Sequence, residues 1–123
     1  MMYRILIADD SQYMRENLRE IMHDIGYEVV GEATNGLDVV ELYRFLLPDI
    51  VFVDMKMPES SGIDALKRII DINKEAVVIM LSVVGKLDQV LEALNCGAKS
   101  YLTKPFDKIS ALHAIKQAML EES

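Results

Sequence analysis

Five polar side chains of this sequence follow short apolar runs, and together they are suited to binding a divalent metal ion. They are Asp9, Asp10, Asp54, Ser82 and Lys104. Carboxylates held about 5 Å apart repel one another by roughly 3 kcal/mol per pair at an effective dielectric near 20, which is more than one lysine offsets. A divalent cation would relieve this repulsion. Because oxygen atoms are the only ligands offered, the set favours Mg²⁺, or Mn²⁺, over zinc.

The elements that must position these residues alternate along the chain. Apolar runs rich in Ile and Val predict five strands, at Tyr3–Ala8, Val29–Ala33, Ile50–Val53, Val77–Leu81 and Ser100–Thr103. Helical segments are predicted over Ser11–Ile25, from Asn35-Gly36 to before Pro48, from Ser61-Gly62, over Leu87–Asn95 and after Pro105. The first, third and fourth strands lack polar alternation, which predicts burial on both faces. In the last helix we expect one apolar face made by Ile109, Leu112, Ile115 and Met119.

Five strand–helix units with short connections predict an α/β fold. We expect a doubly wound, five-stranded parallel sheet of flavodoxin-like order 2-1-3-4-5, with five helices. A barrel of eight such units would need about twice this length. The carboxyl ends of the strands then meet at one edge, roughly 5 Å apart for neighbours and about 10 Å between the third and fifth strands. The long side chain of Lys104 can cross the larger gap.

Composition limits the remaining function classes. The 123 residues are 51% hydrophobic and 27% charged, which predicts one domain over residues 1–123 that folds without a metal or a disulfide. The net charge of -7 argues against direct nucleic-acid binding. The one cysteine, Cys96, fits a reducing, cytoplasmic location. No apolar run reaches the roughly 20 residues of a membrane span, so we expect no membrane association.

The combination of motifs resembles the receiver domain of two-component response regulators. The residues that carry the resemblance are Asp9-Asp10, Asp54-Met55-Lys56-Met57-Pro58, Gly62, Ser82 and Tyr101-Leu102-Thr103-Lys104-Pro105-Phe106, and they span essentially the whole chain. Within that family, Val29-Val30-Gly31-Glu32-Ala33 followed by Asn35-Gly36 is most similar to single-domain chemotaxis regulators of the CheY kind. The resemblance implies a phosphorylated signalling protein, not an enzyme with a separate substrate.

The resemblance also implies a role for each acidic residue. Asp54 would accept a phosphoryl group from a sensor histidine kinase or a phosphotransfer protein. Asp10, Asp54 and the backbone carbonyl of Lys56 would bind Mg²⁺ directly, and Asp9 would assist through water. Neutralising the charge on the phosphoryl oxygens is most of what such a transfer requires.

Three further residues receive roles from the resemblance. Lys104 would pair with one phosphoryl oxygen, and the Ser82 hydroxyl would hydrogen-bond another. Lys104-Pro105 becomes a candidate cis peptide bond. If Ser82 moves towards the phosphoryl group, Tyr101 could turn inwards and change a surface formed by residues 87–95, 100–103 and 108–120. A downstream protein would bind there, and a phosphatase is a further candidate partner. The competing interpretation makes Tyr101 a half-buried aromatic of an edge strand.

Alternative functions are distinguishable by motif. The chain could be a stand-alone switch, for example in chemotaxis, or the receiver half of a longer transcriptional regulator. A magnesium-dependent phosphohydrolase or a flavin mononucleotide binder fits less well, because Asp9-Asp10-Ser11 forms a loop that would repel phosphate without a metal. Val83 stands where the family usually has a small residue after Ser82, so we expect it to narrow access to Asp54.

Overall fold

The computed structural model describes residues 2–120, which form one parallel sheet flanked by helices. The strands are β1 (Arg4–Ala8), β2 (Glu28–Ala33), β3 (Ile50–Asp54), β4 (Val78–Val83) and β5 (Ser100–Lys104). The helices are α1 (Gln12–Ile25), α2 (Gly36–Leu46), α3 (Gly62–Ile72), α4 (Leu87–Asn95) and α5 (Lys108–Leu120). The order β2-β1-β3-β4-β5 confirms the predicted fold. The prediction of one domain over 1–123 also includes Met1 and residues 121–123, which lie outside the described residues.

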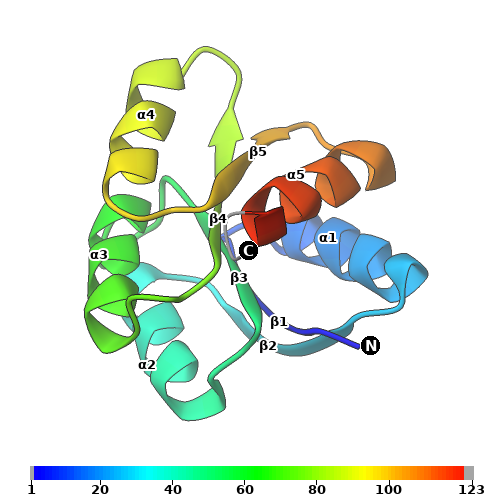
Figure 1. The fold of residues 1–123 in the computed structure, drawn as a ribbon, viewed down its shortest axis with the longest axis horizontal. Helices are drawn as coiled ribbons and strands as arrows, with labels where there is room; N and C mark the ends of the chain where they lie inside the picture. The colour runs from blue at the N-terminus through cyan, green and yellow to red at the C-terminus, as the bar shows by residue number, and fades with distance from the viewer. Residues whose placement is uncertain (1, 121–123) are drawn as a thin grey trace.

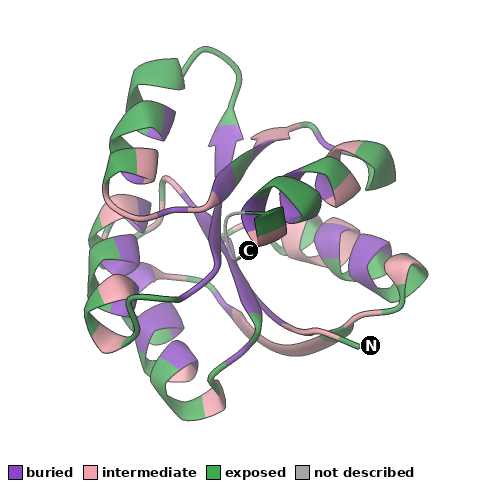
Figure 2. Ribbon diagram, viewed as in Figure 1, coloured by how far each residue is buried: buried purple, intermediate pink, exposed green. Residues whose placement is uncertain are grey.

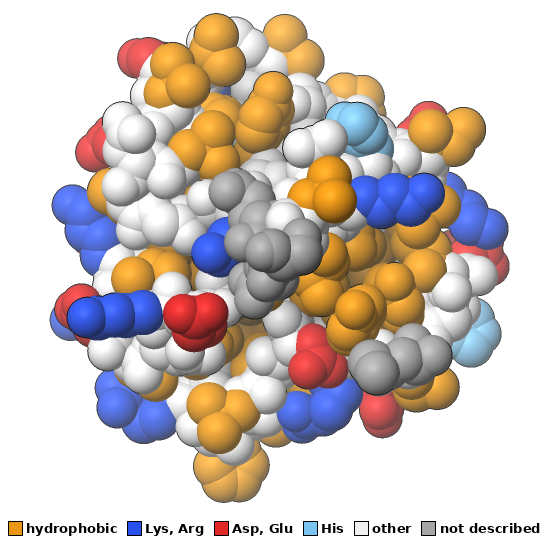
Figure 3. Space-filling model, viewed as in Figure 1, with side chains coloured by type: hydrophobic (Ala, Val, Ile, Leu, Met, Phe, Trp, Pro, Cys, Tyr) orange, Lys and Arg blue, Asp and Glu red, His pale blue; other side chains and the backbone are white. Residues whose placement is uncertain are grey.

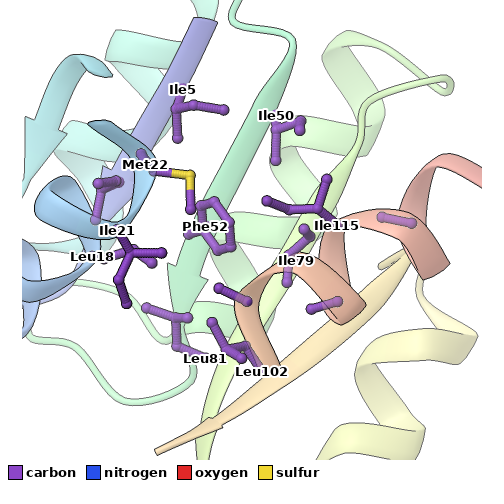
Figure 4. Packing of buried hydrophobic residues seen from close by; sticks show 14 of the residues in the cluster. Ile5, Leu18, Ile21, Met22, Ile50, Phe52, Ile79, Leu81, Leu102 and Ile115 are labelled. Carbon is purple, nitrogen blue, oxygen red and sulfur yellow. The ribbon is translucent and has the colours of Figure 1, made fainter. Parts of the chain in front are cut away.

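The helices cover the sheet on both faces (Figure 1). Helices α1 and α5 lie on one face, and α2, α3 and α4 lie on the other. Successive residues of a strand point to opposite faces, so one strand supplies both cores. Phe52 packs under α1 and α5 (Figure 4), whereas its neighbours Val51 and Val53 pack under the three other helices.

Burial along the strands follows this layering (Figure 2). Every residue of β3 is buried, as are the last four residues of β1 and the first five of β4. The edge strands β2 and β5 are only partly buried. The prediction that the first, third and fourth strands are buried on both faces is therefore confirmed.

Side-chain caps fix where three helices begin. Ser11 accepts a hydrogen bond from the amide of Met14 at 3.3 Å, and Ser61 accepts one from the amide of Asp64 at 3.1 Å. Asn35 does the same for Asp38 at 2.8 Å. Each cap satisfies a backbone donor that the first turn leaves without a helical partner. The caps at Ser11 and Ser61 start α1 and α3 shortly after Asp9 and Asp54, which keeps the connections at the functional edge short.

Two local predictions need correction. Strands β3, β4 and β5 run further than expected, so Asp54, Ser82 and Lys104 are strand residues themselves. The face expected for the last helix was wrong in part: Ile109 is 79% exposed and Leu112 is only partly buried, whereas Ile115 is buried and Met119 packs against the core. The buried residues of α5 are Ala111, Ala114, Ile115 and Ala118. Small side chains let this helix approach both the sheet and α1 closely.

The surface carries no dominant charge on the face shown in Figure 3. Acidic and basic side chains alternate around its rim, with hydrophobic side chains between them. Among the described residues, no helix is both long and apolar enough to cross a membrane.

Candidate functional site

The carboxyl ends of β1, β3 and β5 bring three charged side chains together. Asp9 directly follows β1, Asp54 ends β3, and Lys104 ends β5. The Lys104 ammonium nitrogen lies 2.7 Å from Oδ2 of Asp9 and 3.3 Å from Oδ1 of Asp54. Lys104 therefore crosses from the edge strand to two carboxylates, as predicted from the length of its side chain. The Lys104–Pro105 peptide bond is cis.

Asp9 is held almost entirely inside the protein. The residue is fully buried, and its Oδ1 accepts a hydrogen bond from the Ser11 amide at 2.9 Å. Its own amide donates to the carbonyl of Ala33 on β2 at 3.1 Å. Oδ2 has the Lys104 ammonium nearby but no hydrogen bond of good geometry. A buried carboxylate oxygen in this condition is able to receive a further cationic partner.

Burial and charge together set the protonation of the site. Burial raises the pKa of the Asp54 carboxyl from its usual 3.8, and the nearby Asp9 charge raises it further, to about 6, against the opposing effect of Lys104. For Lys104, burial alone would lower the pKa, but the carboxylates of Asp9 and Asp54 outweigh it and raise that pKa above its usual value. Lys104 consequently stays charged at neutral pH.

The three acidic residues are grouped closely enough to hold one metal ion. Asp9, Asp10 and Asp54 each offer a carboxylate oxygen, and these oxygens lie within 4.8 Å of one another. Asp10 is exposed, which leaves one side of the group open to water. An all-oxygen donor set with room for bound water fits Mg²⁺. The incompletely satisfied Oδ2 of Asp9 supports the same fit.

The loop between β3 and α3 packs directly against Asp54. A Cβ atom at Gly62 would lie 2.1 Å from the Asp54 carbonyl oxygen, so only glycine fits there. The Gly62 amide donates to the Met55 carbonyl at 3.0 Å, which closes the loop. Lys56 is exposed, and its backbone N–H lies where it favours the charged form of Asp54 and so lowers the pKa of that carboxyl. The role expected for Lys56, a metal ligand through its backbone carbonyl, stays a prediction.

Ser82 lies on β4 and Tyr101 on β5, and in the described part of the chain neither shows a hydrogen bond to the charged groups of the site. The Ser82 hydroxyl is buried and donates to the Val83 carbonyl at 3.2 Å. In the register of β4 and β5, Ser82 is opposite Thr103, and Val83 is opposite Lys104. Tyr101 is 42% exposed, so its ring points outwards. The structure thus brings together the predicted acidic residues and Lys104, whereas Ser82 keeps a backbone partner.

One residue at the site was missed by sequence reasoning. Arg15, in the first turn of α1, donates from Nη1 to the Asp9 carbonyl at 2.8 Å. Its Nε lies 3.1 Å from Oε1 of Glu32 on β2. In the sequence Arg15 is one of several charged residues off the apolar stripe of α1, and only its place one turn after Ser11 could have drawn attention to it.

The fold and the acidic edge define a class of signalling protein. The sequence matches the family described as "Response regulator receiver domain" over residues 5–116. The chain therefore belongs to the receiver domain family of two-component response regulators. Receiver domains bind Mg²⁺ at an acidic pocket, and in this chain Asp9, Asp10 and Asp54 are grouped closely enough to hold a metal ion.

Individual relatives point to the CheY group. "Chemotaxis protein CheY" of Thermotoga maritima is 46% identical over 114 residues, which are 93% of this chain and 95% of that protein. The protein of the same name from Bacillus subtilis is 43% identical over 97% of this chain and 99% of its own length. A solved "CheX-CheY-BeF3-Mg+2 complex from Borrelia burgdorferi" has a TM-score of 0.89 at 33% identity, covering 95% of this chain and 89% of that chain.

Proposed function

We propose that this protein is a phosphorylated switch of the chemotaxis type, in which Asp54 accepts a phosphoryl group from the histidine of a sensor kinase or phosphotransfer protein. The observation that carries the proposal is the pair of contacts from the Lys104 ammonium to the carboxylates of Asp9 and Asp54. A lysine held there can neutralise a phosphoryl oxygen beside the carboxylate that receives it. The names of the CheY relatives support chemotaxis as the setting.

The proposed transfer has a simple balance of bonds. An oxygen of Asp54 forms a bond to phosphorus while the bond from phosphorus to the donor histidine nitrogen breaks. That nitrogen keeps the electron pair and takes up a proton from water. Lys104 pairs with one phosphoryl oxygen, and the Ser82 hydroxyl leaves the Val83 carbonyl to hydrogen-bond another. A weak nucleophile becomes effective because the charge that develops on phosphoryl oxygens is neutralised.

The acidic group holds the metal in this proposal. Asp10, Asp54 and the backbone carbonyl of Lys56 bind Mg²⁺, or Mn²⁺, and Asp9 assists through water. When bound, the ion supplies positive charge to the phosphoryl oxygens. The solved complex from Borrelia burgdorferi pairs its CheY with Mg²⁺, which supports this choice of ion.

The same proposal includes an output surface on α4, β5 and α5. The exposed Tyr101 lines a groove of roughly 630 Å³ between these elements, together with Leu94, Pro105, His113 and Gln117. Movement of Ser82 towards the phosphoryl group lets Tyr101 turn inwards, and this changes the groove that a downstream protein contacts. A phosphatase is a further partner class, and the Borrelia burgdorferi structure, in which CheY is in complex with CheX, supports binding of a second protein. We place the protein in the cytoplasm and assign it no separate substrate.

Intact-protein mass spectrometry tests the phosphoacceptor proposal. The protein is incubated with acetyl phosphate in Mg²⁺ or in EDTA, and the acyl phosphate is then reduced with borohydride to mark the modified residue. We expect one phosphoryl group per chain in Mg²⁺, almost none in EDTA, and the reduced residue at Asp54. An adduct at another residue, or no adduct from either acetyl phosphate or a sensor kinase, would contradict the proposal.

Access to Asp54 gives a second prediction. Val83 is 51% exposed and lies opposite Lys104 in the sheet, so we expect it to narrow the path of a small donor to Asp54. We expect Val83→Ala to be phosphorylated severalfold faster by acetyl phosphate, because a branched side chain is removed from that path. Val84→Ala is the matched control, since Val84 is 76% exposed and follows β4. Equal rates for wild type and Val83→Ala would show that Val83 does not limit access.

A further inference from the structure

Arg15 links three elements at the acidic edge. It lies in the first turn of α1, donates from Nη1 to the carbonyl of Asp9 at 2.8 Å, and places Nε 3.1 Å from Glu32 on β2. Its side chain is only 14% exposed. Glu32 is held in turn by a second arginine, Arg19, which contacts its other carboxylate oxygen. The Arg15 side chain is thus anchored at one end and presents a donor to the loop after β1.

The atom that Arg15 holds controls two acidic side chains together. The carbonyl of Asp9 belongs to the peptide unit that joins Asp9 to Asp10, and this unit is planar. Fixing the direction of the carbonyl therefore fixes the orientation of the plane that carries the Cα atoms of Asp9 and Asp10. Their carboxylates are two of the three that gather within 4.8 Å at the site. We infer that Arg15 is a positioning residue, which holds the Asp9–Asp10 peptide so that both carboxylates face the metal site.

The chemistry of arginine suits this role. A guanidinium group has several donors in a rigid planar fork, so it can bond to Glu32 and to the Asp9 carbonyl together, which a lysine ammonium does less well. Its positive charge alone has the opposite effect, because a cation near a metal site repels the metal. Removing Arg15 would therefore tighten Mg²⁺ binding if the residue acted only through charge, and weaken it if the residue acts by positioning.

Arg19 provides a matched control for Arg15. Both arginines lie on α1, carry the same charge and contact the same carboxylate of Glu32. Arg19 is more exposed, with 48% of its side chain accessible, and no contact between it and Asp9 is observed. Arg15→Met and Arg19→Met each remove one charge and one contact to Glu32, but only the first frees the Asp9 carbonyl.

Mg²⁺ titration of the two variants tests the inference, which rests on the proposed metal site. Amide chemical shifts of the loop after β3 give the dissociation constant. We expect Arg15→Met to weaken Mg²⁺ binding about tenfold, as removal of a group that orients a ligand does. Arg19→Met should change it by less than about twofold, because its charge is exposed and screened. Tighter or unchanged binding in Arg15→Met, or equal weakening in both variants, would overturn the positioning role.

A second readout needs no metal and separates this inference from the proposed function. The Ser11 amide donates to the Asp9 carboxylate, so its hydrogen exchange in EDTA reports the order of the loop. Exchange at Ser11 should be faster in Arg15→Met than in Arg19→Met, with the α1 amides of both serving as reference. Equal exchange would overturn the positioning role. If wild type binds no Mg²⁺, the metal proposal fails, while Ser11 exchange still decides whether Arg15 orders the loop.

Discussion

Replacing Asp54 with asparagine should abolish the phosphoryl adduct and at the same time make the metal-free protein more stable at neutral pH. The adduct is lost because an amide oxygen does not replace a carboxylate as nucleophile. Stability rises because burial and the Asp9 charge raise the pKa of Asp54 to about 6 in the folded protein, so the ionised form disfavours folding. Loss of function combined with gain of stability is the pattern expected at a functional residue.

The pH dependence of this gain follows from the direction of the shift. A carboxyl group whose pKa is raised from 3.8 to about 6 binds its proton more tightly in the folded state, so its unfavourable effect grows between these pH values. Above pH 6 we expect Asp54→Asn to exceed wild type by about 1 to 2 kcal/mol, with allowance for partial solvent screening. Near pH 3 the difference should disappear, because Asp54 is then protonated in both states.

Urea denaturation in EDTA across this pH range measures the effect. Asp71→Asn is the control, because Asp71 is an exposed aspartate of α3 away from the site. It should keep the adduct and show no comparable gain in stability. An Asp54→Asn protein that still accepts one phosphoryl group, or that is less stable than wild type at pH 8, would contradict the prediction.

The sequence was sufficient to predict the fold and the members of the acidic group. Apolar runs separated by amphipathic segments predicted the strands and helices, and the family resemblance supported the strand order. Charged residues placed after those runs were then expected to meet at one edge of the sheet. The sequence could not distinguish the neighbours Asp9 and Asp10, which are the same residue type. The structure buries Asp9 fully and leaves Asp10 exposed, a difference set by which side of the chain faces the core.

Contacts that depend on how a helix lies across the sheet were beyond sequence reasoning. Arg15 and Glu32 are 17 residues apart, and their pairing depends on how α1 lies across β1 and β2. The buried face of α5 was missed for a related reason. Helical spacing predicted Ile109 and Leu112 on the apolar face of this helix, but the small residues Ala111 and Ala118 are the ones buried in the core with α1 and the sheet. Close approach of a helix favours small side chains over large ones.

Replacing Lys104 with methionine should lower both stability and phosphorylation, and Mg²⁺ should restore part of the stability. The Lys104 ammonium lies 2.7 Å from Asp9 and 3.3 Å from Asp54, and both carboxylates are buried. Without it two like charges remain together with no cation, which destabilises the metal-free protein by about 2 to 4 kcal/mol. Part of this cost is relieved because Asp54, no longer stabilised by Lys104, takes up a proton more readily.

Comparison of EDTA with saturating Mg²⁺ separates the two roles of Lys104. In urea denaturation, Mg²⁺ should stabilise Lys104→Met more than it stabilises wild type, because the ion then provides the only positive charge among the three carboxylates. Phosphorylation by acetyl phosphate should nevertheless fall about 100-fold even in Mg²⁺, since a positioned donor to the phosphoryl group is lost. Lys108→Met, which changes an exposed lysine of α5, should leave both measurements near wild type. If Lys104→Met were as stable as Lys108→Met in EDTA, the buried carboxylates would not depend on Lys104 for their stability. If Lys104→Met were phosphorylated at the wild-type rate, Lys104 would have no part in the proposed transfer.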